Sequence, residues 1–359
     1  MWPRSKWLRV VLFAVPLIFV ALLWGLVRQQ RPRFVATPAM AQALALSYDG
    51  TRLAVAAENG QFLWYEAGQK HVLPLETAPG FRSDFAVASP PSLQFARDGS
   101  TLFGSNLFLS NDNTKTAYAW NLATNSIAWS AGSTYKDDVN GFALASNASR
   151  MAQHSYDVVK VRDLTGAGAP AKNPQSRYGR DFPVLMRLRV PRFLATGRSI
   201  FPDVIALSAN NSELIIADSS GRLQFWSVAT GKKTAQTPPM PASNGDFSEL
   251  KPSPDGRFVA LCDYTGVALW DTKTGLWTRG ALTLSTLHNI AWMPDSRSLW
   301  LSGFVAPATD NDKTQKLRVP DLHLLRVLPT WGPVAVSGDG HTLATRTDQG
   351  DGVWLWNIG

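Results

Sequence analysis

The chain has 359 residues, of which 45% are apolar and 17% are charged. This balance is ample for a packed globular body and excludes a disordered chain. The formal charge of +8 suggests a nucleic-acid partner, but six of the 35 basic residues lie in the first 33 positions, where there is no acid. The remaining 29 stand against 27 acidic residues, so we expect no nucleic-acid partner. A single cysteine, Cys262, excludes an intrachain disulfide and a multi-cysteine metal site.

The first predicted element is a helix from Val10 to Val27, a run of 18 residues without a charge. Such a helix is about 27 Å long, close to the thickness of a bilayer core. The run is longer than the apolar core of a cleaved signal peptide, and the small-x-small site at Ala39 to Ala41 lies too far downstream. We therefore predict that residues 1–30 form a tail and a retained transmembrane signal anchor. A cleaved signal peptide and a buried helix of a soluble protein are the alternatives.

The orientation of this single-pass anchor in the cell membrane is predicted from the length of its tail. The positive-inside rule gives little bias, because three basic residues stand on each side of the helix. They are Arg4, Lys6, Arg9, Arg28, Arg31 and Arg33. A tail of a few residues is most simply left in the cytoplasm. We therefore expect the rest of the chain outside the cytoplasm, which is the periplasm in a bacterium.

Residues 31–359 consist of a repeated unit, which is clearest around Ser253-Pro254-Asp255-Gly256. Here four strand-sized apolar runs are separated by turn residues, which is typical of a small antiparallel sheet. A similar Asp or Asn turn occurs seven times, at positions 49, 98, 147, 210, 255, 295 and 339. Seven units of this period predict an all-β fold, a seven-bladed β-propeller of four-stranded antiparallel blades.

A bulky residue followed by a polar one marks the predicted third strand of each unit. The pairs are Trp64-Tyr65, Trp120-Asn121, Val161-Arg162, Trp226-Ser227, Trp270-Asp271, Val319-Pro320 and Trp356-Asn357. Tryptophan takes this place in five units. A recurrence at blade spacing favours one packing position between neighbouring sheets over a cluster of binding-site aromatics.

On these repeats the chain resembles the WD40-like family of β-propellers over about residues 33–359. The resemblance is strongest in the fifth, fourth and seventh units. No Gly-His dipeptide opens the units, and Ser220 and Thr265 stand where the family has a structural Asp. We therefore expect the hydrogen-bonded tetrad of the family to be missing. Quinoprotein-type propellers, which tend to have eight blades, are the alternative relatives, as Leu122 to Asn125 followed by Trp129 suggests.

The seventh unit ends after its third strand, and the segment Arg33 to Thr37 belongs to no unit. A ring of blades has to close or leave exposed strand edges. We predict that Arg33 to Thr37 supplies the missing outer strand of the seventh blade. The predicted anchor would then lead directly into the closure.

Several long insertions lie between second and third strands or between one blade and the next, and these connections share one face of a propeller. They are Ala78 to Pro91, Asn111 to Asn113, Ala131 to Asn140, Pro238 to Phe247 and Ala306 to Gln315. Loops on a rigid scaffold often carry recognition residues, although plain surface growth is as good an explanation. The candidate surface, with aromatic and charged groups suited to a protein or a glycan partner, is Phe81, Arg82, Asp84, Tyr135, Lys136, Asp137 and Asp138.

A basic stretch lies at 166–203, where an insertion from Gly166 to Phe182 joins third and fourth strands. Arg187 and Arg189 alternate there with apolar residues, as on an outer strand with one wet face. Edge protection by charge is the simpler interpretation, and an anionic partner or lipid headgroup is the alternative.

The chain contains no local motif of a catalytic or metal site: no Gly-rich phosphate loop, His-Glu-x-x-His, Cys-x-x-Cys or nucleophile elbow. We therefore expect no enzyme and no cofactor, but a membrane-anchored scaffold for protein–protein interaction at the extracytoplasmic face. A propeller-type hydrolase or oxidoreductase with an axial active site is the main alternative. A ligand sensor that signals through its single helix is a weaker one, because its tail is too short for a signalling domain.

Overall fold

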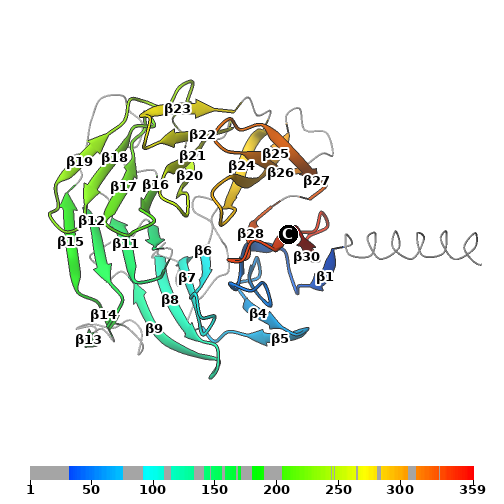
Figure 1. Ribbon diagram of the computed structural model, residues 1–359. Helices are drawn as coiled ribbons and strands as arrows, with labels where there is room; N and C mark the ends of the chain where they lie inside the picture. The colour runs from blue at the N-terminus through cyan, green and yellow to red at the C-terminus, as the bar shows by residue number, and fades with distance from the viewer. Residues whose placement is uncertain are drawn as a thin grey trace, which may run out of the picture.

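A computed structural model describes most of the chain after position 31. The described residues are 32–75, 92–108, 115–132, 141–145, 147–155, 158–166, 169–170, 180–189, 204–243, 245, 247–263, 266–280, 284–305, 313–330 and 332–359. They form seven four-stranded antiparallel sheets arranged in a ring (Figure 1). The predicted fold class, a seven-bladed propeller with four-stranded blades, is confirmed for these residues, and the eight-bladed alternative is wrong.

The first four blades follow one another along the chain. Blade 1 contains β2 (Ala41–Leu46), β3 (Arg52–Ala57), β4 (Phe62–Glu66) and β5 (Gln69–Val72). Blade 2 contains β6 (Ser92–Phe95), β7 (Thr101–Phe108), β8 (Lys115–Asn121) and β9 (Ser126–Gly132). Blade 3 contains β10 (Gly141–Leu144), β11 (Arg150–Ser155), β12 (Val158–Asp163) and β15 (Val184–Arg189). Blade 4 contains β16 (Val204–Leu207), β17 (Glu213–Ala217), β18 (Leu223–Ser227) and β19 (Lys233–Gln236).

The last three blades complete the ring. Blade 5 contains β20 (Phe247–Pro252), β21 (Phe258–Asp263), β22 (Gly266–Asp271) and β23 (Leu276–Arg279). Blade 6 contains β24 (Leu284–Trp292), β25 (Ser298–Val305), β26 (Lys313–Arg318) and β27 (Leu324–Leu328). Blade 7 contains β28 (Val334–Val336), β29 (Thr342–Arg346), β30 (Gly352–Asn357) and β1 (Arg33–Ala36).

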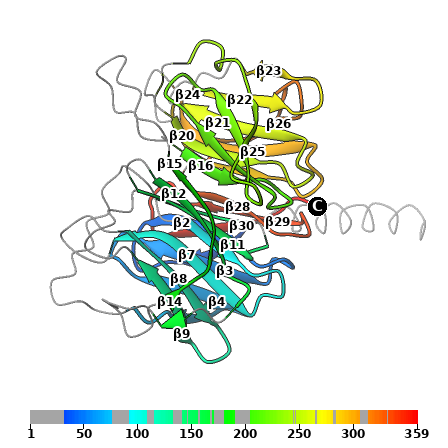
Figure 2. The same cartoon turned by 90° about the vertical axis from the view of Figure 1, so that its left-hand side faces the viewer.

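The N-terminal strand β1 closes the ring as predicted. It pairs antiparallel with β30, with Arg33 opposite Leu355 and Ala36 opposite Gly352. The backbone N–H of Thr37 extends the pairing by donating to the carbonyl of Asp351 at 3.0 Å. Figure 2, the view turned by 90°, shows blade 7 between blades 1 and 6, and β28 contacts the first strands of both. The outer strand of blade 7 therefore comes from the opposite end of the chain.

The core lies between the blades, in clusters that each draw apolar residues from two neighbouring sheets. First strands of adjacent blades contact one another around the axis, except that between blades 2 and 3 the first strand β10 contacts the second strand β7. The burial of a strand depends on its place in the blade. Every residue of the third strand β22 is buried, whereas the outer strand β15 buries only Met186 and Leu188. Arg187 and Arg189 are exposed, as the alternation predicted, because successive side chains of a strand point to opposite faces.

The packing position of the third strand is confirmed for four of the seven predicted pairs. In these blades the tryptophan lies opposite an apolar residue four positions after the Asp or Asn of the turn. The four are Trp120, Trp226, Trp270 and Trp356, opposite Leu102, Leu214, Val259 and Leu343. Each packs in a cluster shared with the preceding blade.

The other three pairs were predicted in the wrong register. The equivalent residues are Tyr65, Arg162 and Leu317, so Trp64 and Val161 are one position early and Val319 is two positions late. A shift of one residue turns a side chain to the other face of a sheet. Trp64 accordingly packs in the cluster shared with blade 2, and its ring stacks on His71 of the adjacent strand β5 in its own blade, with centroids 4.1 Å apart.

The structure tests two further expectations from the sequence. The expected lack of Asp in the turn before the third strand is wrong for blade 4, where the Asp218 carboxylate accepts bonds from the N–H groups of Ser220 and Arg222. The insertion after β12 does join third and fourth strands, and it includes a short hairpin of β13 (Ala169–Pro170) and β14 (Arg180–Asp181).

The predicted anchor, Val10 to Val27, lies outside the described residues. Within the described part of the chain, which starts at 32, no helix has the length and apolar character needed to cross a membrane.

Candidate functional site

The seven turns between first and second strands define one face of the propeller, which we call the turn face. In every blade the side-chain oxygen of the Asp or Asn accepts a bond from the backbone N–H two residues later, at 2.9 to 3.1 Å. The acceptors are Asp49, Asp98, Asn147, Asn210, Asp255, Asp295 and Asp339. The residue after the Asp or Asn has a positive φ in every blade, for example 74° at Gly256. Glycine adopts a positive φ without strain, and short polar residues tolerate it in turns.

A serine two positions before the turn residue strengthens four of the seven turns. Its hydroxyl donates to the Asp or Asn and accepts the backbone N–H that opens the second strand. In blade 5, Ser253 Oγ lies 2.6 Å from Asp255 and 2.9 Å from the N–H of Phe258. The equivalent serines are Ser47, Ser208 and Ser337. The repeated Ser-x-Asp/Asn pattern is therefore a device for folding the turn.

Polar contacts also link the turn of one blade to the next blade. Arg52 Nη1 of blade 1 donates to the carbonyl of Gly99 in blade 2 at 2.6 Å. Arg150 of blade 3 donates to the carbonyl of Asn211 in blade 4. The N–H of Asp339 in blade 7 donates to the carbonyl of Tyr48 in blade 1 at 2.8 Å. The turn face is thus tied together around much of the ring.

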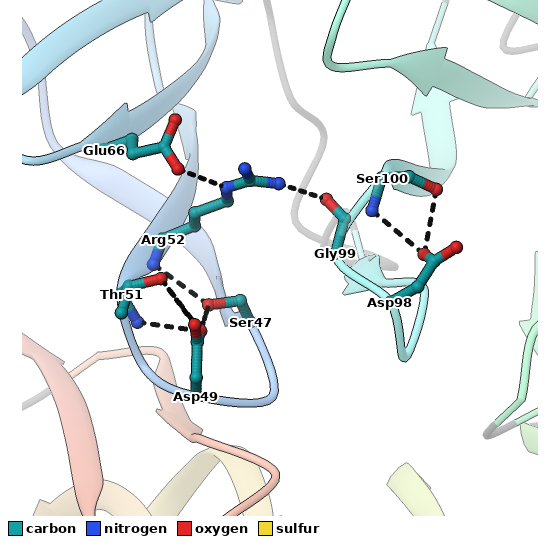
Figure 3. A network of polar contacts seen from close by, with 8 residues as sticks. All are labelled: Ser47, Asp49, Thr51, Arg52, Glu66, Asp98, Gly99 and Ser100. Atoms are coloured by element: carbon teal, nitrogen blue, oxygen red, sulfur yellow. Dashed lines mark hydrogen bonds and ion pairs between the residues drawn. The ribbon is translucent and has the colours of Figure 1, made fainter.

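A hollow of about 250 Å³ lies on this face between blades 1 and 2 (Figure 3). Its lining includes three carboxylates and two guanidinium groups, those of Asp49, Glu66, Asp98, Arg52 and Arg97. Arg52 crosses the hollow, with Nε on Glu66 at 2.8 Å and its other end on Gly99. A similar hollow of about 310 Å³ lies between blades 4 and 5.

The two aspartates of the first hollow are already engaged in hydrogen bonds, and these bonds lower their pKa values. The Ser47 hydroxyl is the main group that lowers the pKa of Asp49, and the N–H of Ser100 is the main group that lowers the pKa of Asp98. A carboxylate held in this way is a weak base and accepts hydrogen bonds from its own turn. The arrangement holds two blades together, and Arg52 and Arg97 offset two of its three negative charges.

The other reactive or charged side chains that are buried among the described residues have structural roles. Cys262 is fully buried, and burial raises the pKa of its thiol well above the usual value. Asp263, also buried, pairs with Arg279 at 3.1 Å, and Arg279 also donates to the carbonyl of Pro241. No group of three His, Cys, Asp or Glu side chains in the described part of the chain is placed to hold a metal ion.

The seven predicted partner-surface residues, Phe81, Arg82, Asp84, Tyr135, Lys136, Asp137 and Asp138, lie outside the described residues. The strands that flank them are described. Residues 76–91 connect β5 to β6, and residues 133–140 connect β9 to β10, so both connect a fourth strand to the next first strand. Such connections leave from the face opposite the turn face, which we call the insertion face.

The inter-blade contacts of Arg52, Arg150 and Arg346 were not predicted from the sequence. Each is a single cation at the start or end of a second strand, and its acceptor is a backbone carbonyl of another blade. The acceptor of Arg346 is Ala41, 305 positions away. A backbone acceptor leaves no mark in the sequence. The one available signal was that a basic residue, rather than an apolar one, begins β3 and β11.

Comparison with known proteins shows the fold and no nearer relationship. No family model matches the chain, and no curated protein matches it. Solved structures do match. A chain of the crystal structure of the mitotic checkpoint complex has a TM-score of 0.63 and 14% identity, over 92% of this chain and 96% of that one. The Cps50 (Swd1) β-propeller domain of Myceliophteria thermophila has a TM-score of 0.64 and 13% identity, over 91% and 98%. The chain is a seven-bladed β-propeller that resembles WD40 propellers.

Proposed function

We propose that the protein is a membrane-anchored, non-enzymatic scaffold that binds another protein through its insertion face. The observation that carries the proposal is the closed ring, in which neighbouring blades are joined by apolar clusters and turn-face contacts. Such a ring is a rigid support for variable loops. The similarity to propellers from a checkpoint complex and from Swd1 fits an interaction role.

The engaged carboxylates of the turn face support the same proposal. Asp49 and Asp98 serve their own turns, and Glu66 pairs with Arg52. The turn contacts lower the pKa of Asp49 and of Asp98, whereas a general base works best with a pKa near the working pH. The insertion face is then the surface left for recognition.

The partner is best sought with the full chain. We expect a pull-down from detergent-solubilised membranes to recover a protein in stoichiometric amount, and a Phe81→Ala/Tyr135→Ala variant to recover less of it. The matched control is Lys233→Ala, a change at an exposed residue of β19. Recovery of no protein, together with a metal that co-purifies in stoichiometric amount, would contradict the scaffold and favour the axial enzyme.

The extracytoplasmic placement is a separate part of the proposal. It rests on the uncharged run from Val10 to Val27 and on the short tail before it. A reporter enzyme that works only outside the cytoplasm, fused after Gly359, should be active. Activity of a cytoplasm-only reporter at the same position would contradict this orientation.

A further inference from the structure

Large apolar side chains are exposed on the outer strands of blades 5 to 7, and also at Val72 of blade 1 and at Val184 and Leu185 of blade 3. Leu276 begins β23 and is 66% exposed, and Leu324 and Leu325 begin β27 and are 47% and 49% exposed. Phe34, the second residue of β1, is 44% exposed. These four are on outer strands of three consecutive blades, 5 to 7 (Figure 1). Fourth strands begin at the turn face, so these side chains gather at the turn-face end of the rim.

The outer strand of blade 6 exposes more apolar side chains than the outer strands of blades 3 and 4 do. Exposed strand edges usually carry charged residues that discourage contact with apolar surfaces. Strand β15 exposes Arg187 and Arg189 beside Val184 and Leu185, and β19 exposes Lys233 beside Thr234, Ala235 and Gln236. In β27 the exposed residues are Leu324, Leu325, Arg326 and Val327, three apolar residues to one cation. A surface with three apolar residues and one cation suits contact with a layer that is apolar inside and charged at its surface.

The position of β1, the first strand of the chain, indicates that this layer is a lipid bilayer. Strand β1 starts at Arg33 on the same part of the rim, and the uncharged run ends at Val27. Six residue steps span at most about 20 Å of extended chain. If the run crosses a bilayer, as proposed above, the turn-face rim of blade 7 is held within that distance of the membrane surface.

The charges near this rim fit an anionic bilayer. Arg28 and Arg31 precede β1, and Arg33 and Arg326 are exposed on β1 and β27. Aspartates of the turns lie nearer the axis on the same face, because they follow the innermost strands. A disc lying flat on its turn face would bring those carboxylates against anionic headgroups. Contact through the rim alone avoids this repulsion.

We propose that the turn-face rim of blades 5 to 7, formed by Phe34, Leu276, Leu324 and Leu325, contacts the surface of an anionic lipid bilayer. The contact rests on the proposed anchor and tilts the disc, so that the insertion face points away from the membrane. Apolar side chains enter the headgroup boundary while Arg33 and Arg326 meet lipid phosphates, as in other surface-bound segments.

The test uses the full chain in vesicles of phosphatidylcholine and phosphatidylglycerol, with an environment-sensitive fluorophore on an introduced cysteine. The native thiol is buried, so labelling of the unaltered protein is the blank. The test position is Leu325→Cys, and the matched control is Lys233→Cys on the outer strand of blade 4. Doxyl-labelled lipid should quench the label at 325 at least about twofold more than the label at 233, because the quencher acts only near the bilayer. The difference should shrink in vesicles of phosphatidylcholine alone.

Flotation of the same samples separates the two proposals. Protein that fails to float with vesicles contradicts the anchor, and with it the rim contact. Protein that floats, but with equal quenching at the two positions, overturns the rim contact and leaves the anchor intact. A blue-shifted label at 325 that doxyl lipid does not quench would mean that a protein or a second copy covers the rim, which also overturns the lipid assignment.

Discussion

Replacing Arg52 with methionine should lower the free energy of unfolding by about 2 kcal/mol. The side chain is 28% exposed and makes two bonds, to the Gly99 carbonyl at 2.6 Å and to Glu66 at 2.8 Å (Figure 3). A hydrogen bond from a charged donor contributes about 1.5–3 kcal/mol, with the lower end fitting a partly exposed site. The Glu66 carboxylate is 41% exposed, so the ion pair adds only about 0.5 kcal/mol. Methionine retains most of the aliphatic stem and removes both bonds.

Equilibrium unfolding of the full chain in urea, followed by tryptophan fluorescence, measures this difference. Glu66→Gln is the matched control, because it removes the ion pair while a neutral acceptor for Arg52 Nε remains. It should cost no more than about 0.5 kcal/mol. An Arg52→Met variant as stable as the wild type, or a Glu66→Gln variant as unstable as Arg52→Met, would refute the view that the Gly99 contact joins blades 1 and 2.

Three other predictions follow from the turns, the closure and the core. Asp49→Asn should flatten the loss of stability between about pH 5 and pH 2 in urea titrations. The folded-state pKa of Asp49 is lowered, so its stabilisation is present above the unfolded pKa and lost as pH falls through the folded pKa; an unchanged profile would count against this. Gly352→Ala should cost about 1–3 kcal/mol and speed proteolysis at Arg33, because a Cβ would lie 2.6 Å from the Val35 carbonyl, whereas Gly166→Ala meets open space and should change neither. Trp120→Phe should cost about 1–3 kcal/mol in the same assay, because the buried indole donates to the Pro74 carbonyl at 2.8 Å; a neutral effect would contradict the inter-blade role.

The turns made the fold predictable. Each Asp or Asn uses its own side chain to fold the backbone two residues on, so the signal is local and appears in the sequence at every blade. The closure was predictable for a related reason: a fourth strand was missing, and Arg33 to Thr37 was the strand-like segment without a unit. Strand order and the position of each insertion between strands followed from these two observations.

Register and inter-blade contacts were less predictable. Trp64 and Tyr65 are both large and aromatic, and only the pairing of Tyr65 with Leu53 decides which of them faces the preceding blade. In blade 6 the third strand ends at Arg318, so Leu317 takes the packing position that was assigned to Val319. Arg52 bonds to a carbonyl 47 positions away in the next blade, and Arg346 bonds to one 305 positions away that only the closure of the ring brings near.

The central claim is that the N-terminal strand seals the ring against β30, next to the predicted anchor. It is tested most directly by a disulfide between Phe34→Cys and Trp354→Cys in the full chain. These residues are opposite each other, with ring centroids 5.2 Å apart, and residues facing across antiparallel strands are within reach of a disulfide. Mild oxidation should cross-link this pair, seen by mass spectrometry of tryptic peptides, and leave Phe34→Cys/Trp356→Cys free, because that pair is offset by two residues. No cross-link in the first pair, or equal cross-linking in both, would contradict the closure.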